Sequence, residues 1–561
     1  MNKKEKIILL LIILLGTFFR IYGINWDQNQ HLHPDERFLT MVTESIKWPN
    51  NIYEYFSTDK STLNPHNMNF SFFIYGTFPI FLTKFLSEVF KYTDYNSLTI
   101  FGRFLSGFFD ILVIIIVFLI GRVIFSIRAG LAASFIYSIS VLPIQLSHFY
   151  ATDTFLNFFL ISSFYLLIRY VYSRSYFWII PSGVTYGIAL ASKISAITYI
   201  SSFIIIFLLI INLKKRIFIS IIYFCLIIFL TFRIFQPYAF LNKTFFKLNP
   251  KFIQNLQELK YMSQPGSTFP PSIQWNNTPK IIFPLKNIIF WGMGIPIATT
   301  SLLGIIYAIF IIFKKRKRIF NNFWGQDKKT IITISIISNI IIIFIFQSIQ
   351  FVKPLRYFII IYPLLSILSG LIINDIFNFT YKKSPKISII LGCIWLSTLI
   401  IWPVSFISIY RNNHSRVYAS EWIYINIPHK SILGIEHWDD GLPLSLDVSR
   451  INNLYKFEEL PMFNTDSEEK WLSINEKFEK IDYIIITSNR AYGSLYRLPE
   501  KYPITIQYYK DLFNDKLRFK KIAEFISRPS IFGFEFIDDN ADETFTVYDH
   551  PRVSIFKKIK L

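Results

Sequence analysis

The chain has little cysteine: only Cys225 and Cys393 occur among 561 residues. Each lies within an apolar run, and neither belongs to a spacing that suits a zinc site or a disulfide framework. We therefore expect both to be small, buried, apolar side chains. The sequence also has no internal repeat, no long linker and no low-complexity tail.

Charge is scarce as well. Charged residues make up 17% of the chain and hydrophobic residues 52%, with a mean hydropathy of +0.39. Water-soluble proteins of this length are rarely so apolar. Several runs carry almost no charge, in segments that approach the roughly 20 residues needed to cross a bilayer; they include residues 7–16, 111–120, 200–211, 331–346 and 389–402. A signal peptide occurs once, at the N-terminus, so these runs predict a multi-spanning membrane protein.

Acidic residues are fewer than basic ones, 37 against 58, which gives a formal net charge of +21. Much of the excess lies in short clusters between apolar runs, at residues 214–216, 314–318 and 382–386. Such clusters are typical of cytoplasmic loops. We therefore interpret the charge as a topology signal and expect no nucleic-acid partner.

The positions of the basic residues predict the topology. Lys3, Lys4 and Lys6 indicate a cytoplasmic N-terminus. Residues 71–90 are apolar enough either to cross the membrane or to lie in its interface. If they crossed it, every later basic cluster would lie outside the cell, so we expect an interfacial helix. Residues 1–410 then contain about eleven transmembrane helices, with outer loops at 25–98 and 236–286. The expected spans cover residues 6–24, 101–125, 128–148, 154–172, 176–190, 195–212, 217–235, 287–313, 330–350, 355–377 and 389–410.

The chain becomes polar from residue 411 onward. Strand-like runs at 431–436 and 483–487 alternate with helical stretches at 420–425 and 468–478. This alternation predicts an α/β domain of about 150 residues, 411–561. The topology puts that domain on the extracytoplasmic side of the cell membrane.

Charged residues gather at the outer ends of the predicted spans or in the adjoining loops. They are Asp35, Glu36, Arg103, Asp153, Lys193, Lys353 and Arg356. Ionisable groups near apolar spans are costly and often functional. Carboxylates and cations on one face suit a reaction between a hydroxyl nucleophile and a phosphorylated electrophile held by a lipid. Simpler interpretations stay open, because Asp153 can be a helix N-cap and Lys353 can extend to lipid headgroups.

Two histidines, His33 and His148, lie beside these carboxylates. Either could contact an acceptor or, with a carboxylate, a divalent metal. No metal-ligand spacing is present, and we favour hydrogen-bonded histidines. Metal dependence stays open.

Five short motifs follow one another among the predicted spans. They are HPDE at 33–36, GRFLS at 102–106, SHFYATD at 147–153, GIALASK at 187–193 and KPLRY at 353–357. Their order and spacing resemble the GT-C superfamily of glycosyltransferases, specifically the protein O-mannosyltransferase-like, family 39 group that uses a phospholipid carrier. The resemblance covers nearly the whole membrane part.

The resemblance implies a polyprenyl-phosphate sugar as donor and an inverting transfer to an acceptor hydroxyl. It implies that Asp35 is the base and that Glu36 and Asp153 are supporting carboxylates. It also implies cations on the donor phosphate, for which the candidates are Arg103, Lys193, Arg356 and Lys353. The sugar, a mannose or another hexose or pentose, is not specified, and the acceptor is a protein Ser/Thr, a lipid or a glycan.

The C-terminal part departs from the eukaryotic members of the group. Its segments 436–443 and 547–551 contain Asp-Asp-Gly and Asp-His-Pro, which favour turns but could also contact acceptor. The main rival interpretation is a transporter or flippase of a lipid-linked or anionic substrate. Against it, the charges gather at one face instead of mid-membrane, and the sequence shows no inverted repeat.

Overall fold

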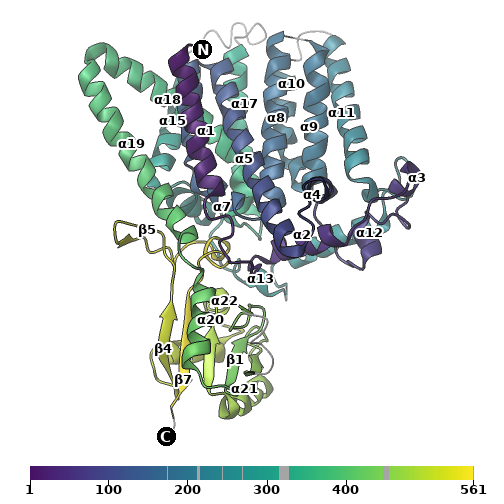
Figure 1. The fold of residues 1–561 in the computed structure, drawn as a ribbon. Coiled ribbons are helices and arrows are strands. Elements are labelled where there is room, and N and C mark those ends of the chain that lie inside the picture. Colours follow the sequence, from purple (N-terminus) through teal and green to yellow (C-terminus); the bar gives the residue numbers. More distant parts are fainter. Residues whose placement is uncertain are drawn as a thin grey trace.

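The computed structural model describes residues 1–173, 175–210, 215–242, 244–267, 269–314, 328–446 and 454–559. It shows a bundle of long helices, with a smaller α/β domain attached at one end (Figure 1). The N-terminus lies at the opposite end of the bundle. Most of the basic cluster at 314–318, and Lys214 of the cluster at 214–216, lie outside the described residues.

A helix or a broken helix occupies the position of every predicted span. The bundle comprises α1 (Lys3–Ile21), α5 (Tyr95–Ile124), α6 (Ile127–Ser138), α7 (Val141–Ser147), α8 (Thr152–Ser173), α9 (Ile179–Ser192), η3 (Ile194–Tyr199), α10 (Ile200–Ile210), α11 (Lys215–Phe235), α15 (Ile295–Lys314), α17 (Lys328–Ile349), η7 (Leu355–Ile361), α18 (Tyr362–Lys383) and α19 (Pro385–Ile407). Within the described residues, seven helices are long and apolar enough to cross a membrane, or eight if α6 and α7, bent by 58°, form one span. The chain is thus a multi-pass membrane protein, and the count of eleven stays a prediction.

Small residues let the central helices approach closely. A Cβ on Gly370 of α18 would lie 2.3 Å from the Ala129 carbonyl oxygen of α6, and one on Gly130 would lie 2.6 Å from the Phe118 carbonyl oxygen of α5. Close backbone contact of this kind stabilises helix pairs in lipid, where the hydrophobic effect between helices is absent. The packing of α18 on α6 therefore fixes the position of η7, which directly precedes α18.

One buried charge pair lies inside the bundle. Arg20 Nε of α1 donates to Asp110 Oδ2 of α5 at 2.6 Å, and both side chains are fully buried. Tyr137 also donates its hydroxyl to Asp110. A paired and hydrogen-bonded charge is tolerated in an apolar interior, and we assign this pair to helix packing.

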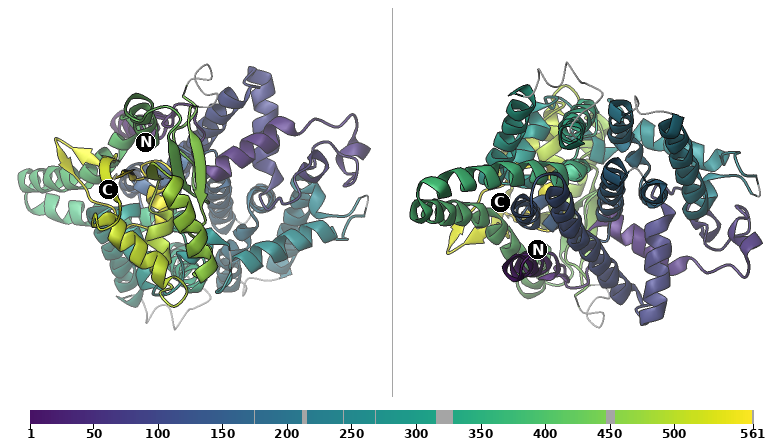
Figure 2. Two further views of the ribbon diagram at one scale, coloured as in Figure 1. Left: turned by 90° about the horizontal axis from the view of Figure 1, so that it is seen from below. Right: turned by 90° about the horizontal axis from the view of Figure 1, so that it is seen from above.

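The two outer loops form short helices across the end of the bundle that carries the α/β domain (Figure 1). The first loop contains α2 (Pro34–Ser45), α3 (Ile52–Tyr55), η1 (Pro65–Met68) and α4 (Thr77–Phe90), and the second contains η5 (Pro237–Ala239), α12 (Pro250–Met262), α13 (Pro270–Ile273) and α14 (Ile282–Asn287). With 14 residues, α4 is not among the helices that could span. Seen along the bundle axis, both loops extend to one side and the α/β domain covers the other (Figure 2).

The C-terminal part is built on a five-stranded sheet of order β2-β1-β3-β7-β4. Its strands are β1 (Ile432–Glu436), β2 (Lys456–Leu460), β3 (Tyr483–Ile486), β4 (Phe519–Phe525) and β7 (Val553–Lys558), and its helices are α20 (Ser415–Asn426), α21 (Glu468–Lys480), α22 (Arg490–Leu495) and α23 (Pro503–Phe513). β1 runs parallel to β2 and β3, whereas β7 is antiparallel to both neighbours. The predicted alternation of strands and helices is confirmed.

Between β4 and β7 the chain leaves the sheet and packs on the bundle. This segment, residues 526–552, contains β5 (Ser530–Ile531), β6 (Phe534–Glu535) and α24 (Glu543–Thr546). Asp542 Oδ2 accepts a hydrogen bond from the Leu355 backbone N–H at 2.7 Å. Gln145 of α7 donates to Asp549 Oδ2 at 2.9 Å, and Tyr410 donates to the same oxygen at 2.9 Å. We call residues 526–552 the docking segment.

One expectation about the cysteines is wrong. Cys225 of α11 and Cys393 of α19 are exposed on the protein surface and are not buried in its core. Apolar residues on the outer faces of a membrane bundle contact lipid, so an apolar run does not indicate burial within the protein.

Candidate active site

The first residue of interest is Asp35, in the first turn of α2. His33 caps this helix by accepting from the Glu36 backbone N–H, and Pro34 occupies its first turn. Proline at this position has no N–H to leave unsatisfied and favours helix initiation. The cap thus directs Asp35 towards η7, where Arg356 Nη1 donates to Asp35 Oδ2 at 2.6 Å.

A second ion pair joins α8 to the end of α9. Lys193 Nζ lies 2.7 Å from Asp153 Oδ1. Asp153 sits in the first turn of α8, where the helix dipole favours a negative charge. Lys193 follows the last residue of α9, and its ammonium lies 4.7 Å from the ring centre of Tyr357, the residue after Arg356. The two ion pairs are therefore neighbours.

Both pairs line one cavity of about 300 Å³ at the end of the bundle. Other polar side chains also reach it, among them Tyr75, Ser195, Gln347 and Gln350. The rest of its wall is mostly apolar and includes Phe346 of α17 and Ile359 and Ile360 of η7. The cavity thus combines two carboxylates and two cations with an apolar side towards the membrane-spanning helices.

The electrostatics of Asp35 are set by competing effects. Burial raises the pKa of the Asp35 carboxyl, but the ion pair with Arg356, together with His33 and a hydrogen bond from Tyr75, lowers it more, and the net pKa lies well below the usual value. Asp35 is therefore ionised at every ordinary pH while Arg356 is bound to it. The side chains of both residues are about a quarter exposed, at 25% and 23%, so small molecules can reach the pair.

The sequence prediction also included Glu36 and Arg103, and the structure places both away from this cavity. Arg103 donates to both carboxylate oxygens of Glu36, at 2.8 and 2.6 Å, and its other contacts include Asp27 Oδ2 at 2.7 Å. All three side chains are buried. Successive helical residues point about 100° apart, which is why Asp35 and Glu36 face different surroundings.

The remaining predicted residues also lie outside the cavity. Lys353 is buried, and its ammonium donates to the Phe351 carbonyl at 3.0 Å. His148 stacks on Tyr410 with ring centres 3.8 Å apart, and its ring nitrogens face the carbonyls of Ile144 and Tyr22.

His33 packs beside the site. Its ring lies 4.5 Å from that of Phe149 and 4.3 Å from that of Tyr548 in the docking segment. Burial lowers the pKa of His33 to about 4, so its ring is neutral at physiological pH. A very small cavity that also contacts Arg356 and Tyr548 separates it from η7. His33 therefore connects the α2 cap to the C-terminal part.

Sequence reasoning missed two aromatic residues of the cavity. Tyr75 hydrogen-bonds Asp35, and Tyr357 lies against Lys193 and Arg356, the latter 5.7 Å from the ring centre. Tyr357 belongs to the KPLRY motif and could have been found from its place beside Arg356. Nothing near Tyr75 in the sequence indicates its role.

Metal binding was left open by the sequence. Within the described residues, no group of three or more His, Cys, Asp and Glu side chains is arranged to hold a metal ion. The two carboxylates of the cavity are each paired with a cation instead.

Comparison with known proteins adds to this geometry. Residues 81–238 match the dolichyl-phosphate-mannose-protein mannosyltransferase family. Among curated proteins, none matches the chain in sequence.

Several solved structures share the fold. The oligosaccharyltransferase of Archaeoglobus fulgidus in its apo form aligns with a TM-score of 0.55 and 13% identity, over 95% of this chain and 75% of that one. The archaeal oligosaccharyltransferase AglB from Archaeoglobus fulgidus, in complex with an inhibitory peptide and a dolichol-phosphate, aligns with a TM-score of 0.54 and 12% identity, over 100% of this chain and 89% of that one. ArnT from Cupriavidus metallidurans bound to undecaprenyl phosphate aligns with a TM-score of 0.46 and 13% identity, over 99% of this chain and 98% of that one. The chain therefore shares the GT-C fold of the archaeal oligosaccharyltransferase.

Proposed function

We propose that the protein is an integral-membrane glycosyltransferase that transfers a sugar from a polyprenyl-phosphate donor to an acceptor hydroxyl outside the cell. One observation carries the proposal: Asp35–Arg356 and Asp153–Lys193 line the same cavity at one end of a membrane bundle. A phosphate needs the cations, and an attacking hydroxyl needs a carboxylate base.

The donor phosphate would be held by Arg356 and Lys193. Both are in the cavity, and a guanidinium can bind two phosphate oxygens at once. The apolar side chains of α17 and η7 offer a surface for the first isoprene units of the carrier. AglB, which shares the fold, has been solved with a dolichol-phosphate. Arg103 and Lys353 are bound to other groups of the protein and would act through packing.

The same arrangement supplies a base. A donor phosphate competes with Asp35 for Arg356, and losing that ion pair would raise the pKa of the Asp35 carboxyl, since burial then dominates. The carboxylate would take the proton of the acceptor hydroxyl while its oxygen bonds to the anomeric carbon. The bond from that carbon to the phosphate oxygen breaks, and polyprenyl phosphate leaves with its charge on Arg356 and Lys193. Direct displacement inverts the anomeric centre.

Asp153 has a different proposed part. It is 4% exposed and shares Lys193 with the cavity, so it would hold the ammonium in place for the phosphate. The ring of Tyr357 lies against both cations and would shield their charges from bulk water.

The test is release of polyprenyl phosphate by the purified protein in lipid. The protein is given a panel of polyprenyl-phosphate hexoses and pentoses with an extract of its own membranes as acceptor. We expect sugar-dependent release that Asp35→Asn abolishes and Glu44→Gln, an exposed carboxylate on the same helix α2, leaves unchanged. Absence of release from folded wild type with every donor would reject the proposal and favour a transporter.

A further inference from the structure

A second cavity, of about 410 Å³, lies between the α/β domain and the bundle. Its walls come from three parts of the chain: the docking segment, α22 with the residues after it, and the second outer loop. The volume falls within the roughly 300–1,000 Å³ of small-ligand sites. None of the charged residues or histidines predicted for the catalytic site lines it, but His550 belongs to segment 547–551, which the sequence analysis left open as an acceptor contact.

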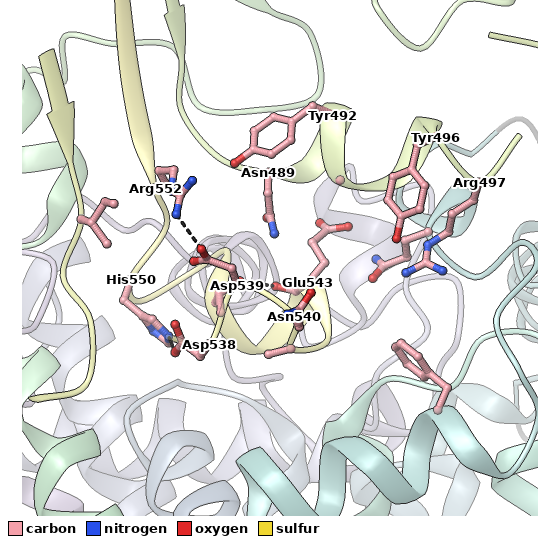
Figure 3. A pocket seen from close by; sticks show the side chains of 16 residues that line it. Asn489, Tyr492, Tyr496, Arg497, Asp538, Asp539, Asn540, Glu543, His550 and Arg552 are labelled. Atoms are coloured by element: carbon pink, nitrogen blue, oxygen red, sulfur yellow. Dashed lines mark hydrogen bonds and ion pairs between the residues drawn. The ribbon is translucent and has the colours of Figure 1, made fainter. Parts of the chain in front are cut away.

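The lining of this cavity is unusually polar. Ligand pockets are generally lined by apolar side chains with a few polar groups. Here most lining side chains can hydrogen-bond; the labelled ones in Figure 3 are Asn489, Tyr492, Tyr496, Arg497, Asp538, Asp539, Asn540, Glu543, His550 and Arg552. An apolar peptide side chain would gain little there, whereas a ligand with many hydroxyls would find donors and acceptors on every side.

The charges of the cavity are nearly balanced. Asp539 accepts from Arg552 at 2.6 Å, and Asp538 accepts from His550 at 2.8 Å. Glu543 lies 3.0 Å from Arg490. Because each carboxylate is already paired, the cavity does not favour a cation, and because carboxylates are present, it does not favour a polyanion. A neutral, hydroxyl-rich ligand fits this balance.

Two groups are placed to contact such a ligand. Tyr496 is half exposed and presents its ring to the cavity (Figure 3). The neighbouring Arg497 has a buried Nε without a hydrogen-bond partner, and no ion pair to its guanidinium occurs among the described residues. An aromatic face beside an unsatisfied donor matches a sugar ring, which has an apolar C–H face and a polar edge.

The cavity is adjacent to the proposed active site. Glu543 and Thr546 of α24 line it, while Thr544 and Phe545 of the same single turn face the small cavity that contacts His33 and Arg356. Asp542, just before α24, binds the backbone of Leu355, next to Arg356. One helical turn therefore separates this cavity from the small cavity that contacts Arg356.

We propose that this cavity binds a saccharide and that the acceptor of the transfer is therefore a glycan chain, one residue of which is held here while another presents its hydroxyl to Asp35. The second part rests on the proposed function, whereas the binding itself does not. Tyr496 would stack on a sugar ring, and Arg497 with Asn489 and Asn540 would bind its hydroxyls.

Binding is tested directly by saturation-transfer difference NMR on the full-length protein in nanodiscs. The probes are mannotetraose, cellotetraose and N-acetylchitotetraose, with a serine- and threonine-containing octapeptide for comparison. We expect saturation transfer to at least one tetrasaccharide and not to the peptide. Tyr496→Ala and Arg497→Ala should each weaken that binding by roughly tenfold.

Matched controls separate the cavity from the rest of the surface. Tyr418→Ala in α20 and Arg518→Ala beside β4 alter exposed residues of the same types outside the cavity and should bind as wild type does. No saccharide binding, binding unchanged by Tyr496→Ala and Arg497→Ala, or binding of the peptide instead would each overturn the inference. Donor turnover is measured on the same samples. Saccharide binding without turnover would reject the proposed transfer reaction but support the saccharide site. Turnover without saccharide binding would support the transfer reaction but reject the saccharide site.

Discussion

Arg356 Nη1 lies 2.6 Å from Asp35 Oδ2, so the guanidinium proposed to bind the donor phosphate also neutralises the carboxylate proposed as base. The guanidinium of Arg356 cannot pair fully with the phosphate and with the Asp35 carboxylate at the same time. Donor binding and activation of Asp35 are therefore coupled: the base would become available when the phosphate draws Arg356 away. As long as Arg356 is paired with it, the Asp35 carboxylate is a poor proton acceptor.

Removal of Arg356 tests this coupling. Arg356→Gln should lower the rate of polyprenyl phosphate release by about 10²–10³-fold, the usual effect of losing one charge-stabilising donor. It should also shift the acid limb of the residual activity to higher pH, because only His33 and Tyr75 then oppose the effect of burial, which raises the pKa of Asp35. The pH profile of release measures this shift. An unchanged acid limb would contradict the coupling, and Arg411→Gln, an exposed arginine outside the site, is the control.

The two adjacent carboxylates should respond differently to neutralisation. Glu36→Gln leaves buried Arg103 with fewer compensating charges and should cost about 3–5 kcal/mol of stability, as breaking a buried ion pair does. Asp35→Asn, at a quarter-exposed side chain, should leave the thermal unfolding temperature nearly unchanged and abolish turnover. Equal losses of stability in the two variants would contradict the separation of their roles.

His550 makes the docking segment sensitive to alkaline pH. Burial lowers the pKa of His550, but Asp549 and Asp538 raise it more, to about 10. The group therefore stabilises the fold fully below the unfolded pKa of about 6.5, and this contribution is lost as the pH rises to about 10. We expect the excess stability of wild type over His550→Gln to shrink across this range. Thermal unfolding at pH 6 to 10.5 measures it, and a constant difference would contradict the prediction.

The proposed topology predicts which residues are reached from outside the cell. In a chain with Cys225→Ser and Cys393→Ser, an exposed cysteine in α21, Ser473→Cys, should react with a membrane-impermeant maleimide on intact cells. Lys383→Cys, at the end of α18, should react only after permeabilisation. The opposite pattern would place the α/β domain inside the cell and reject an extracytoplasmic site.

Much of the membrane part could be predicted from the sequence, because the bilayer alone determines where apolar runs and basic clusters lie. The motifs also predicted Asp35, Asp153, Lys193 and Arg356, which the structure brings to one cavity. The division between Asp35 and Glu36 was not foreseen, although a helix that begins at Pro34 turns them about 100° apart.

The second cavity could not have been predicted. Gln274 and Arg497 are both in its lining, yet they belong to different parts of the chain, and no local pattern indicates that they meet. The same holds for the contact between the rings of His33 and Tyr548. The segment around Asp549 and His550 forms a turn and a bend, as its Asp-His-Pro sequence favours. The sequence did not indicate that the buried side chains of these two residues anchor the docking segment.

The order of the strands also constrains assembly during biosynthesis. β7 lies between β3 and β4 in the sheet, yet it follows the docking segment in the chain. The sheet therefore cannot close until residues beyond 552 have been synthesised, by which time every bundle helix has been inserted. The docking segment, which binds the backbone of Leu355 next to Arg356, is therefore held at both of its ends only after β7 has joined the sheet.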